Sequence, residues 1–432
     1  MRSSRLLAAS VVGVVASGLA VCTVIPASAA SGSAASATSA AHIKPALSAS
    51  SNPATGQTLT LPAPQGRYAT GESQFRLVDD KRQDPWDPTK PYRELMISVF
   101  YPAVHTAGKP FTNQFPAAAA AEIGPALDGG NGLPPGLVNW AATKTHSVQD
   151  AAMAPGHFPV VLYSPGAGDS RDSNVSLVEN LAAQGYVVVT IDHTGEAPAT
   201  EFPDGHVVGN APLLAAFKQV GNDQAAATVL LTKVMNVRLA DTQLVLNRLS
   251  SLPHRLTAGM NLNDIGMFGH SAGGFEAAET MYNDPRVKAG VNLDGTMEYT
   301  EDADGTHLSQ VALHGLKQPL LLMGSTGRYP SSIHVEPSWT SFWQNQKGWK
   351  ADITLNDSQH QSFTDAEPLL AQLAGQIPAS TLTYDNGTVD AQRAVAADRA
   401  LVDSFFNRFL KGGNDHLLDG RGASQYPITF IK

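Results

Sequence analysis

Residues 265–281 read IGMFGHSAGGFEAAETM, and their order of strand-like, small and helix-forming residues is the strongest indication of the fold. It opens with an apolar, strand-like run, continues with the pattern Gly-x-Ser-x-Gly around Ser271, and ends in helix-forming residues. A strand, a tight turn of small residues and a helix, in that order, predict a nucleophile elbow, which presents a serine hydroxyl at the carboxyl edge of a sheet. Because the chain has 38 glycines, the bare pattern would also fit a plain glycine-rich turn, and the prediction rests on its flanks.

A serine hydroxyl becomes a nucleophile only when a base takes its proton and an acid orients that base. Asp294 follows the apolar run 287–293 and therefore ends a predicted strand at the same sheet edge as Ser271. The next apolar run, 319–323, is followed by GSTG, which offers no carboxylate. Asp294 is therefore the predicted acid. It is preferred to three acids in a polar stretch, Glu298, Asp302 and Asp304.

The predicted base is His360, which lies directly beyond the apolar run 351–355. The chain order Ser271, Asp294, His360 is the order of nucleophile, acid and base in the α/β-hydrolase fold. Three other histidines are placed less well, because they precede a strand, follow a stretch with an aromatic residue and a proline, or lie past the last helix: His314, His334 and His416.

The oxyanion of an ester-cleaving reaction needs two N–H donors. Ala272, directly after the nucleophile, is expected to supply one of them. The other is expected from Ala167, in the turn Ser-Pro-Gly-Ala-Gly at 164–168 that follows the apolar run FPVVLY at 158–163.

Strand-like and helix-like segments alternate along most of the chain, which predicts a mostly parallel central sheet with helices on both faces. The expected strands are 93–101, 158–163, 186–191, 265–268, 287–293, 319–323 and 351–355, and the expected helices include 234–249 and 396–410. We expect one α/β-hydrolase catalytic domain over residues 61–432. Segments 102–156 and 193–232 exceed ordinary loop length, so either could cover a site.

The N-terminus has the pattern of an export signal. Two arginines, an apolar stretch and an A-x-A site predict a signal peptide over residues 1–29, and hence a secreted, extracellular protein. Residues 30–60 are rich in Ser and Ala with few large apolar side chains, so we expect a disordered leader there. Cys22 is the single cysteine, which excludes a disulfide framework.

The net charge and the predicted mechanism indicate which kinds of partner and cofactor the chain is expected to lack. The chain of 432 residues has a formal charge of −9, which gives no electrostatic footprint for nucleic acid. A Ser-His-Asp mechanism needs neither a metal nor an organic cofactor, and none is expected.

Several of these motifs together resemble the secreted platelet-activating-factor acetylhydrolase family of α/β-hydrolases. They are VVLYSPGAG, AAQGYVVVTIDH, GHSAGG, VNLDG, QPLLLMGSTGRYP and SQHQSF. The resemblance implies the same roles for the five residues named above. The chain departs from the family in its oxyanion turn, where Pro165-Gly166 stands in place of the usual His-Gly, which leaves the substrate open.

The expected function is that of a serine esterase acting on short-chain acyl esters, of a phospholipid or a small molecule, with transient contact to a lipid surface. A weaker likeness to bacterial cutinases and polyester hydrolases keeps a polyester or triglyceride substrate open. An inactive hydrolase fold that serves as a binding module is the alternative outside the enzymes. The fold and the predicted triad do not indicate which alcohol the hydrolysed ester contains.

Overall fold

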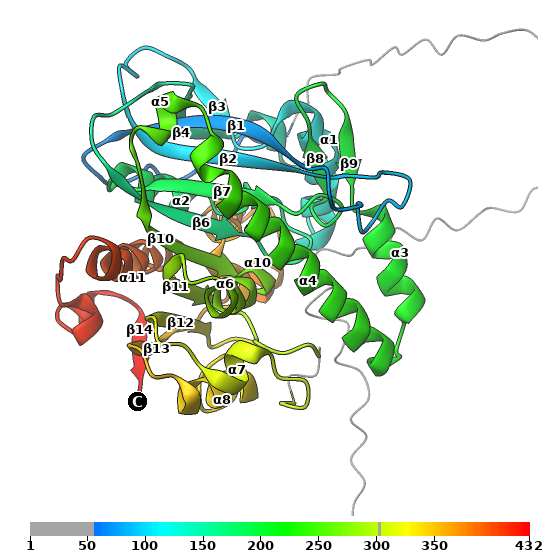
Figure 1. Cartoon of the computed structure of the whole chain (residues 1–432), viewed down its shortest axis with the longest axis vertical. Helices are drawn as coiled ribbons and strands as arrows, with labels where there is room; N and C mark the ends of the chain where they lie inside the picture. Colours follow the sequence, from blue (N-terminus) through cyan, green and yellow to red (C-terminus); the bar gives the residue numbers. More distant parts are fainter. Residues whose placement is uncertain (1–55, 301–303) are drawn as a thin grey trace, which may run out of the picture.

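The computed structural model describes residues 56–300 and 304–432, in which one large twisted sheet is flanked by helices (Figure 1). The strands are β1 (Ala69–Asp79), β2 (Arg93–Val104), β3 (Phe111–Asn113), β4 (Lys144–Gln149), β5 (Ala152–Met153), β6 (Phe158–Ser164), β7 (Val187–Asp192), β8 (Ala199–Glu201), β9 (Val207–Gly209), β10 (Met260–His270), β11 (Val287–Leu293), β12 (Leu320–Ser325), β13 (Lys350–Leu355) and β14 (Ile428–Ile431). The α-helices are α1 (Ala117–Gly130), α2 (Val175–Ala183), α3 (Ala211–Val220), α4 (Gln224–Arg248), α5 (His254–Thr257), α6 (Ala272–Asn283), α7 (Gln310–His314), α8 (Pro337–Asn345), α9 (Ala366–Leu370), α10 (Ala379–Asp385) and α11 (Ala391–Leu410). Short 3-10 helices include η2 (Trp140–Ala142) and η4 (His360–Phe363).

The centre of the sheet is parallel. Its strand order is β14-β13-β12-β11-β10-β6-β7-β2-β1-β4-β3, and every neighbouring pair from β13 to β7 runs parallel. Antiparallel partners flank this centre, β2 beside β7 and β14 beside β13. The carboxyl ends of the parallel strands therefore share one edge, and the predicted α/β-hydrolase fold is confirmed.

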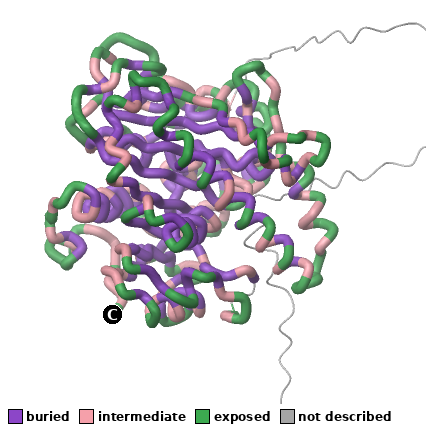
Figure 2. Tube along the Cα trace, viewed as in Figure 1, coloured by how far each residue is buried: buried purple, intermediate pink, exposed green. Residues whose placement is uncertain are grey.

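Strand β6 shows why helices cover both faces of the sheet. Its residues are buried throughout, and successive side chains of a strand point to opposite faces. Val161 packs in one core cluster with Phe405 of α11, whereas Val160 packs in a second cluster with Ala277 of α6. Figure 2 shows this buried sheet in the middle of the molecule, with exposed loops around it.

One helix begins earlier than the sequence predicts, and two strands of the sheet have no predicted counterpart. Helix α4 starts at Gln224, ten residues before the predicted start at Val234, because the Asp223 carboxylate caps it by accepting a hydrogen bond from Ala226 N at 3.1 Å. Strands β1 and β14 were not predicted, although β1 pairs with β2 along its whole length.

Both long segments carry secondary structure of their own. Segment 102–156 contains β3, α1, η2, β4 and β5, and segment 193–232 contains β8, β9, α3 and the start of α4. None of the described helices is long and apolar enough to cross a bilayer.

The folded body begins earlier than the sequence predicts. The proposed signal peptide, residues 1–29, and the leader up to residue 55 lie outside the described residues. Gln57, however, donates its backbone N–H to Leu137 O at 2.8 Å, and Leu59 is only 1% exposed. The predicted boundary after residue 60 is therefore too late, because the isolated Leu59 is an anchoring core residue.

Replacing Leu59 with Ala should lower the free energy of unfolding by about 2–5 kcal/mol, since it removes a fully buried side chain. Thr58→Ala, at the exposed neighbouring position, should leave stability almost unchanged. Urea unfolding of both variants measures the difference. Equal stability of the two would show that the body does not depend on this segment.

Candidate active site

Ser271 lies in the strained turn that a nucleophile elbow requires. It joins β10 to α6 with φ 55° and ψ −122°, in the left-handed region that non-glycine residues rarely adopt. The flanking glycines make the turn possible, because a Cβ on Gly273 would lie 2.0 Å from Ser164 O and one on Gly269 would lie 2.2 Å from Gly273 O. The helix can therefore pass directly against the end of β6.

Asp294 follows β11 at the same sheet edge. Its carboxylate is 4% exposed and accepts hydrogen bonds from Ser325 N at 2.8 Å and Ser325 Oγ at 3.0 Å. Burial by itself raises the pKa of Asp294, but the hydrogen bond and charge of His360 and the Ser325 amide bring it below its ordinary value. The carboxylate is thus kept ionised in a buried position.

His360 meets this carboxylate directly. Its Nδ1 lies 2.7 Å from Asp294 Oδ2, which fixes the ring orientation and leaves Nε2 outside this contact. The side chain is 28% exposed, so solvent and substrate can reach it. Within the described residues the Ser271 hydroxyl has no hydrogen bond to His360, a contact that often tightens only when substrate is bound.

His270, for which the sequence predicts no role, contacts His360 from behind. Its Nε2–H donates to His360 O at 2.9 Å, and the two rings lie 4.4 Å apart between centroids. Burial and the neighbouring His360 lower the pKa of His270 to about 3, so this imidazole stays neutral. The one sequence feature that could have drawn attention to His270 is its position directly before Ser271.

The loop that carries His360 is tied to the start of α2. Asp365 accepts hydrogen bonds from Val175 N at 2.6 Å and Ser176 N at 3.1 Å, which places a carboxylate at the helix N-terminus. Asn174 also donates to Phe363 O at 2.9 Å. These contacts join the loop that carries His360 to α2, the helix that follows the predicted oxyanion turn.

Both predicted oxyanion donors lie beside Ser271. A Cβ on Gly166 would stand 3.5 Å from Ser271 Cβ, so the 164–168 turn lies against the nucleophile. Ala167 is exposed and Ala272 opens α6. Among the hydrogen bonds of the described residues none uses the N–H of either alanine, so both donors are available to a ligand.

A buried cluster of charges lies behind the oxyanion turn. His193 is 1% exposed, and its Nε2 lies 3.1 Å from Ser164 Oγ and 3.2 Å from Glu276 Oε2. Its Nδ1 lies 3.2 Å from Asp241 Oδ2. Burial lowers the pKa of His193, and so does the positive charge of Arg238. The charge of Glu276 and the hydrogen bonds to Asp241 and Glu276 outweigh both effects and raise this pKa to about 9. His193 is thus a cation at neutral pH.

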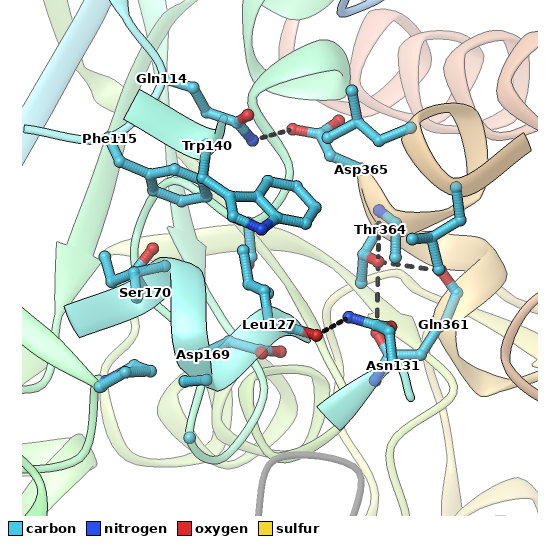
Figure 3. A pocket seen from close by; sticks show the side chains of 18 residues that line it. Gln114, Phe115, Leu127, Asn131, Trp140, Asp169, Ser170, Gln361, Thr364 and Asp365 are labelled. Atoms are coloured by element: carbon cyan, nitrogen blue, oxygen red, sulfur yellow. Dashed lines mark hydrogen bonds between the residues drawn. The ribbon is translucent and has the colours of Figure 1, made fainter. Parts of the chain in front are cut away.

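A pocket adjoins the site. Ser271, Asp294 and His360 are not among its lining residues, but Gln361, next to His360, and Gly168, in the predicted oxyanion turn, are. Figure 3 shows the Trp140 indole among its lining side chains, with Asp169 and Ser170 on one side and Thr364 and Asp365 on the other. Segment 102–156 supplies one wall, and the 168–173 loop and residues 361–370 supply the rest, with Pro198 as the contribution of segment 193–232. The large apolar and aromatic side chains of the lining are Phe115, Ile123, Leu127, Trp140, Leu369 and Leu370.

The pocket also holds a carboxylate. Burial raises the pKa of Asp169 to about 6, against the opposing charges of His360 and Arg238. Its Oδ2 lies 3.9 Å from the His270 ring nitrogen Nδ1, which has no hydrogen bond within the described residues. No cluster of three or more His, Cys, Asp or Glu side chains suited to a metal ion occurs in residues 56–300 and 304–432.

Comparisons with known proteins agree with the α/β-hydrolase fold and with a site for ester hydrolysis. Residues 136–416 match the family model described as platelet-activating factor acetylhydrolase, isoform II. The chain is 27% identical to a probable 1-alkyl-2-acetylglycerophosphocholine esterase of Arthroderma benhamiae, over 86% of this chain and 93% of that protein. It is 22% identical to the platelet-activating factor acetylhydrolase of Cavia porcellus, of which it spans 58%. The structure of a ferulic acid esterase from Streptomyces cinnamoneus is 31% identical, with a TM-score of 0.70, covering 87% of this chain and 99% of that one.

The charge of His193 should make stability depend on pH. A histidine titrates near pH 6.5 in an unfolded chain, so a folded pKa of about 9 stabilises the protein fully below about pH 6.5 and ceases to do so as pH rises to about 9. The loss should be roughly 1.4 kcal/mol per pH unit. Urea unfolding of wild type and His193→Gln between pH 6 and 9.5 should show their stability difference shrinking over this window. A difference that stays constant would mean that the buried ring is uncharged.

Proposed function

Because the chain belongs to the platelet-activating factor acetylhydrolase isoform II family, we propose that it is a secreted serine esterase that hydrolyses short-chain acyl esters with Ser271, His360 and Asp294. That it is a hydrolase of ester substrates follows from the family and its relatives. The observation that best supports these residues is the 2.7 Å bond from His360 Nδ1 to Asp294, next to a serine held at φ 55°.

In the first half of the reaction, Ser271 Oγ attacks the ester carbonyl while His360 Nε2 accepts the hydroxyl proton. Asp294 holds Nδ1–H and stabilises the imidazolium that forms. The negative charge that develops on the carbonyl oxygen is bound by the N–H groups of Ala167 and Ala272. His360 then donates its proton to the departing alcohol, which leaves an acyl group on Ser271.

The second half repeats these steps with water. His360 takes a proton from water, which attacks the acyl carbonyl, and the same two N–H groups stabilise the second oxyanion. The proton returns to Ser271 Oγ as the carboxylic acid leaves. The described residues thus supply a nucleophile, a base, an orienting acid and two donors, which this chemistry requires.

The pocket is the proposed acyl site. It is lined by Gln361, next to His360, and by Gly168 and Asp169, at the end of the predicted oxyanion turn. The names of two relatives indicate acetyl esters as their substrates. We therefore propose an acetyl phospholipid or a similar short acyl ester as the substrate, and export of the protein by residues 1–29.

Ser271→Ala should abolish hydrolysis, with kcat falling by at least about 10⁴-fold, because no other group supplies the nucleophile. The assay follows acetate release from an acetyl phospholipid and cleavage of p-nitrophenyl esters of increasing chain length. Ser380→Ala, at an exposed serine, is the matched control and should keep full activity. Wild-type activity on long chains only would favour a lipase or polyester hydrolase. A wild type as inactive as the variant on every ester would favour a binding module.

An aromatic acyl ester is a second candidate substrate. Two observations favour it, namely the aromatic side chains Phe115 and Trp140 in the pocket wall and the similar ferulic acid esterase structure. A hydroxycinnamoyl ring would then stack on these side chains, while its ester carbonyl reaches Ser271.

Trp140→Leu tests this second candidate. If the acyl ring stacks on the indole, kcat/KM for methyl ferulate should fall about 10-fold or more, while kcat/KM for p-nitrophenyl acetate changes little. Trp86→Leu, at a buried tryptophan outside the pocket, controls for loss of stability. Absence of wild-type activity on methyl ferulate would remove this candidate and leave the short-chain proposal in place.

A further inference from the structure

We propose that Arg238 is a positioning residue for the reaction, which orients the oxyanion donor of Ala167 without touching the substrate. The inference rests on the proposed function, because it assumes that Ala167 N–H binds the oxyanion. It goes beyond that function by assigning a role in catalysis to a buried arginine of α4, which carries no motif of its own.

Arg238 is fully buried, and its guanidinium faces the back of the oxyanion turn. Nη1 donates to Pro165 O at 2.8 Å, and Nη2 donates to Gly166 O at 3.1 Å. Gly166 O also accepts the Asp169 N–H at 3.2 Å, which closes the turn. Two successive carbonyl groups of the turn are therefore held by one side chain.

The planarity of the peptide bond converts these contacts into an orientation. The carbonyl of Gly166 and the N–H of Ala167 belong to the same trans peptide unit, so they point in opposite directions. When Gly166 O is held toward Arg238, the Ala167 N–H must point away from Arg238, toward the open side of the turn. Ser271 lies against this turn, with its Cβ 3.5 Å from the position of a Cβ on Gly166.

Carboxylates hold the guanidinium in place. Glu196 accepts from Nε at 2.8 Å, and Glu276 lies 3.4 Å from Nη1. Glu276 is itself held by Ser164 Oγ at 2.6 Å and Thr242 Oγ1 at 2.5 Å. Because Glu276 belongs to α6, whose first residue is Ala272, the arginine links the turn that carries one donor to the helix that carries the other.

The contacts require an arginine. Its planar fork donates from three nitrogens in fixed directions, whereas a lysine ammonium at the same place reaches fewer acceptors. A buried cation beside two glutamates and two carbonyl groups could also serve stability alone. The two roles differ in one respect, since loss of orientation weakens binding of the transition state more than binding of the substrate.

The experiment compares Arg238→Met and Arg238→Lys with Arg399→Met. Arg399 is a suitable control because it is also buried and also donates to backbone carbonyls, those of Pro62, Ala63 and Ser176, each within 2.9 Å. For the folded fraction of each protein, kcat and KM are measured with p-nitrophenyl acetate. The affinity for a trifluoromethyl ketone is measured as well, because its adduct with a serine places an oxyanion in the site.

Arg238→Met should lower kcat by about 10²–10³-fold, with KM changed less than about threefold, and should weaken trifluoromethyl ketone binding by a similar factor as kcat. Arg238→Lys should recover part of both losses. Arg399→Met should lose stability but keep kcat and inhibitor affinity. If Arg238→Met does not fold, Arg238→Lys and Glu196→Gln test the proposal in its place. Both should lower kcat and the affinity for the trifluoromethyl ketone by similar factors.

The proposal is overturned if a folded Arg238 variant keeps kcat within about threefold, or if its loss appears in KM alone. It is also overturned if Arg399→Met loses kcat to the same extent, since the effect would then be general destabilisation. Failure of the proposed function would look different, because wild type would cleave no ester or Ser271→Ala would remain active.

Discussion

The first turn of α6 passes so close to the end of β6 that no side chain fits between them, and the site depends on this contact. A Cβ on Gly273 would lie 2.0 Å from Ser164 O. The contact brings the nucleophile of one strand–helix unit beside the predicted oxyanion turn of another. It also explains the strained backbone of Ser271. The chain must turn sharply between β10 and α6, because the first turn of α6 lies directly against the end of β6. The strain is held by the packing on both sides of the turn.

The same contact is supported from behind by charges rather than by apolar packing. Arg238, His193, Glu276 and Asp241 are all buried and lie between α4, α6 and the ends of β6 and β7. Burying charges is costly unless each is paired and hydrogen-bonded, and a hydrophobic core of similar volume would cost less. Here the fixed directions of the hydrogen bonds provide something that apolar side chains lack, a defined orientation for the backbone of the turn.

The residues of the candidate site differ in how far the sequence could predict them. Ser271 is marked by its neighbours, and Asp294 and His360 by their places after apolar runs, since the ends of parallel strands share one edge. The structure brings these three to that edge, while their roles remain predictions. The roles of Ser325 and Arg238 could not be predicted from the sequence. Their contacts join elements that are far apart in the chain, and no motif or residue spacing near either residue indicates these contacts. The early start of the folded body was missed for a related reason, since a single buried leucine in a Ser- and Ala-rich stretch has no periodicity.

The two parts of the site lie on different parts of the chain. The groups proposed for bond cleavage follow strands of the central sheet, whereas one pocket wall comes from segment 102–156, which joins the sheet only by short peripheral strands. Changes to the sheet edge alter packing that the whole fold shares, but changes to this wall alter only the space proposed for the acyl group. Relatives can therefore diverge in the ester they accept while they inherit the same hydrolytic apparatus, and the wall is the place where a new specificity would first arise.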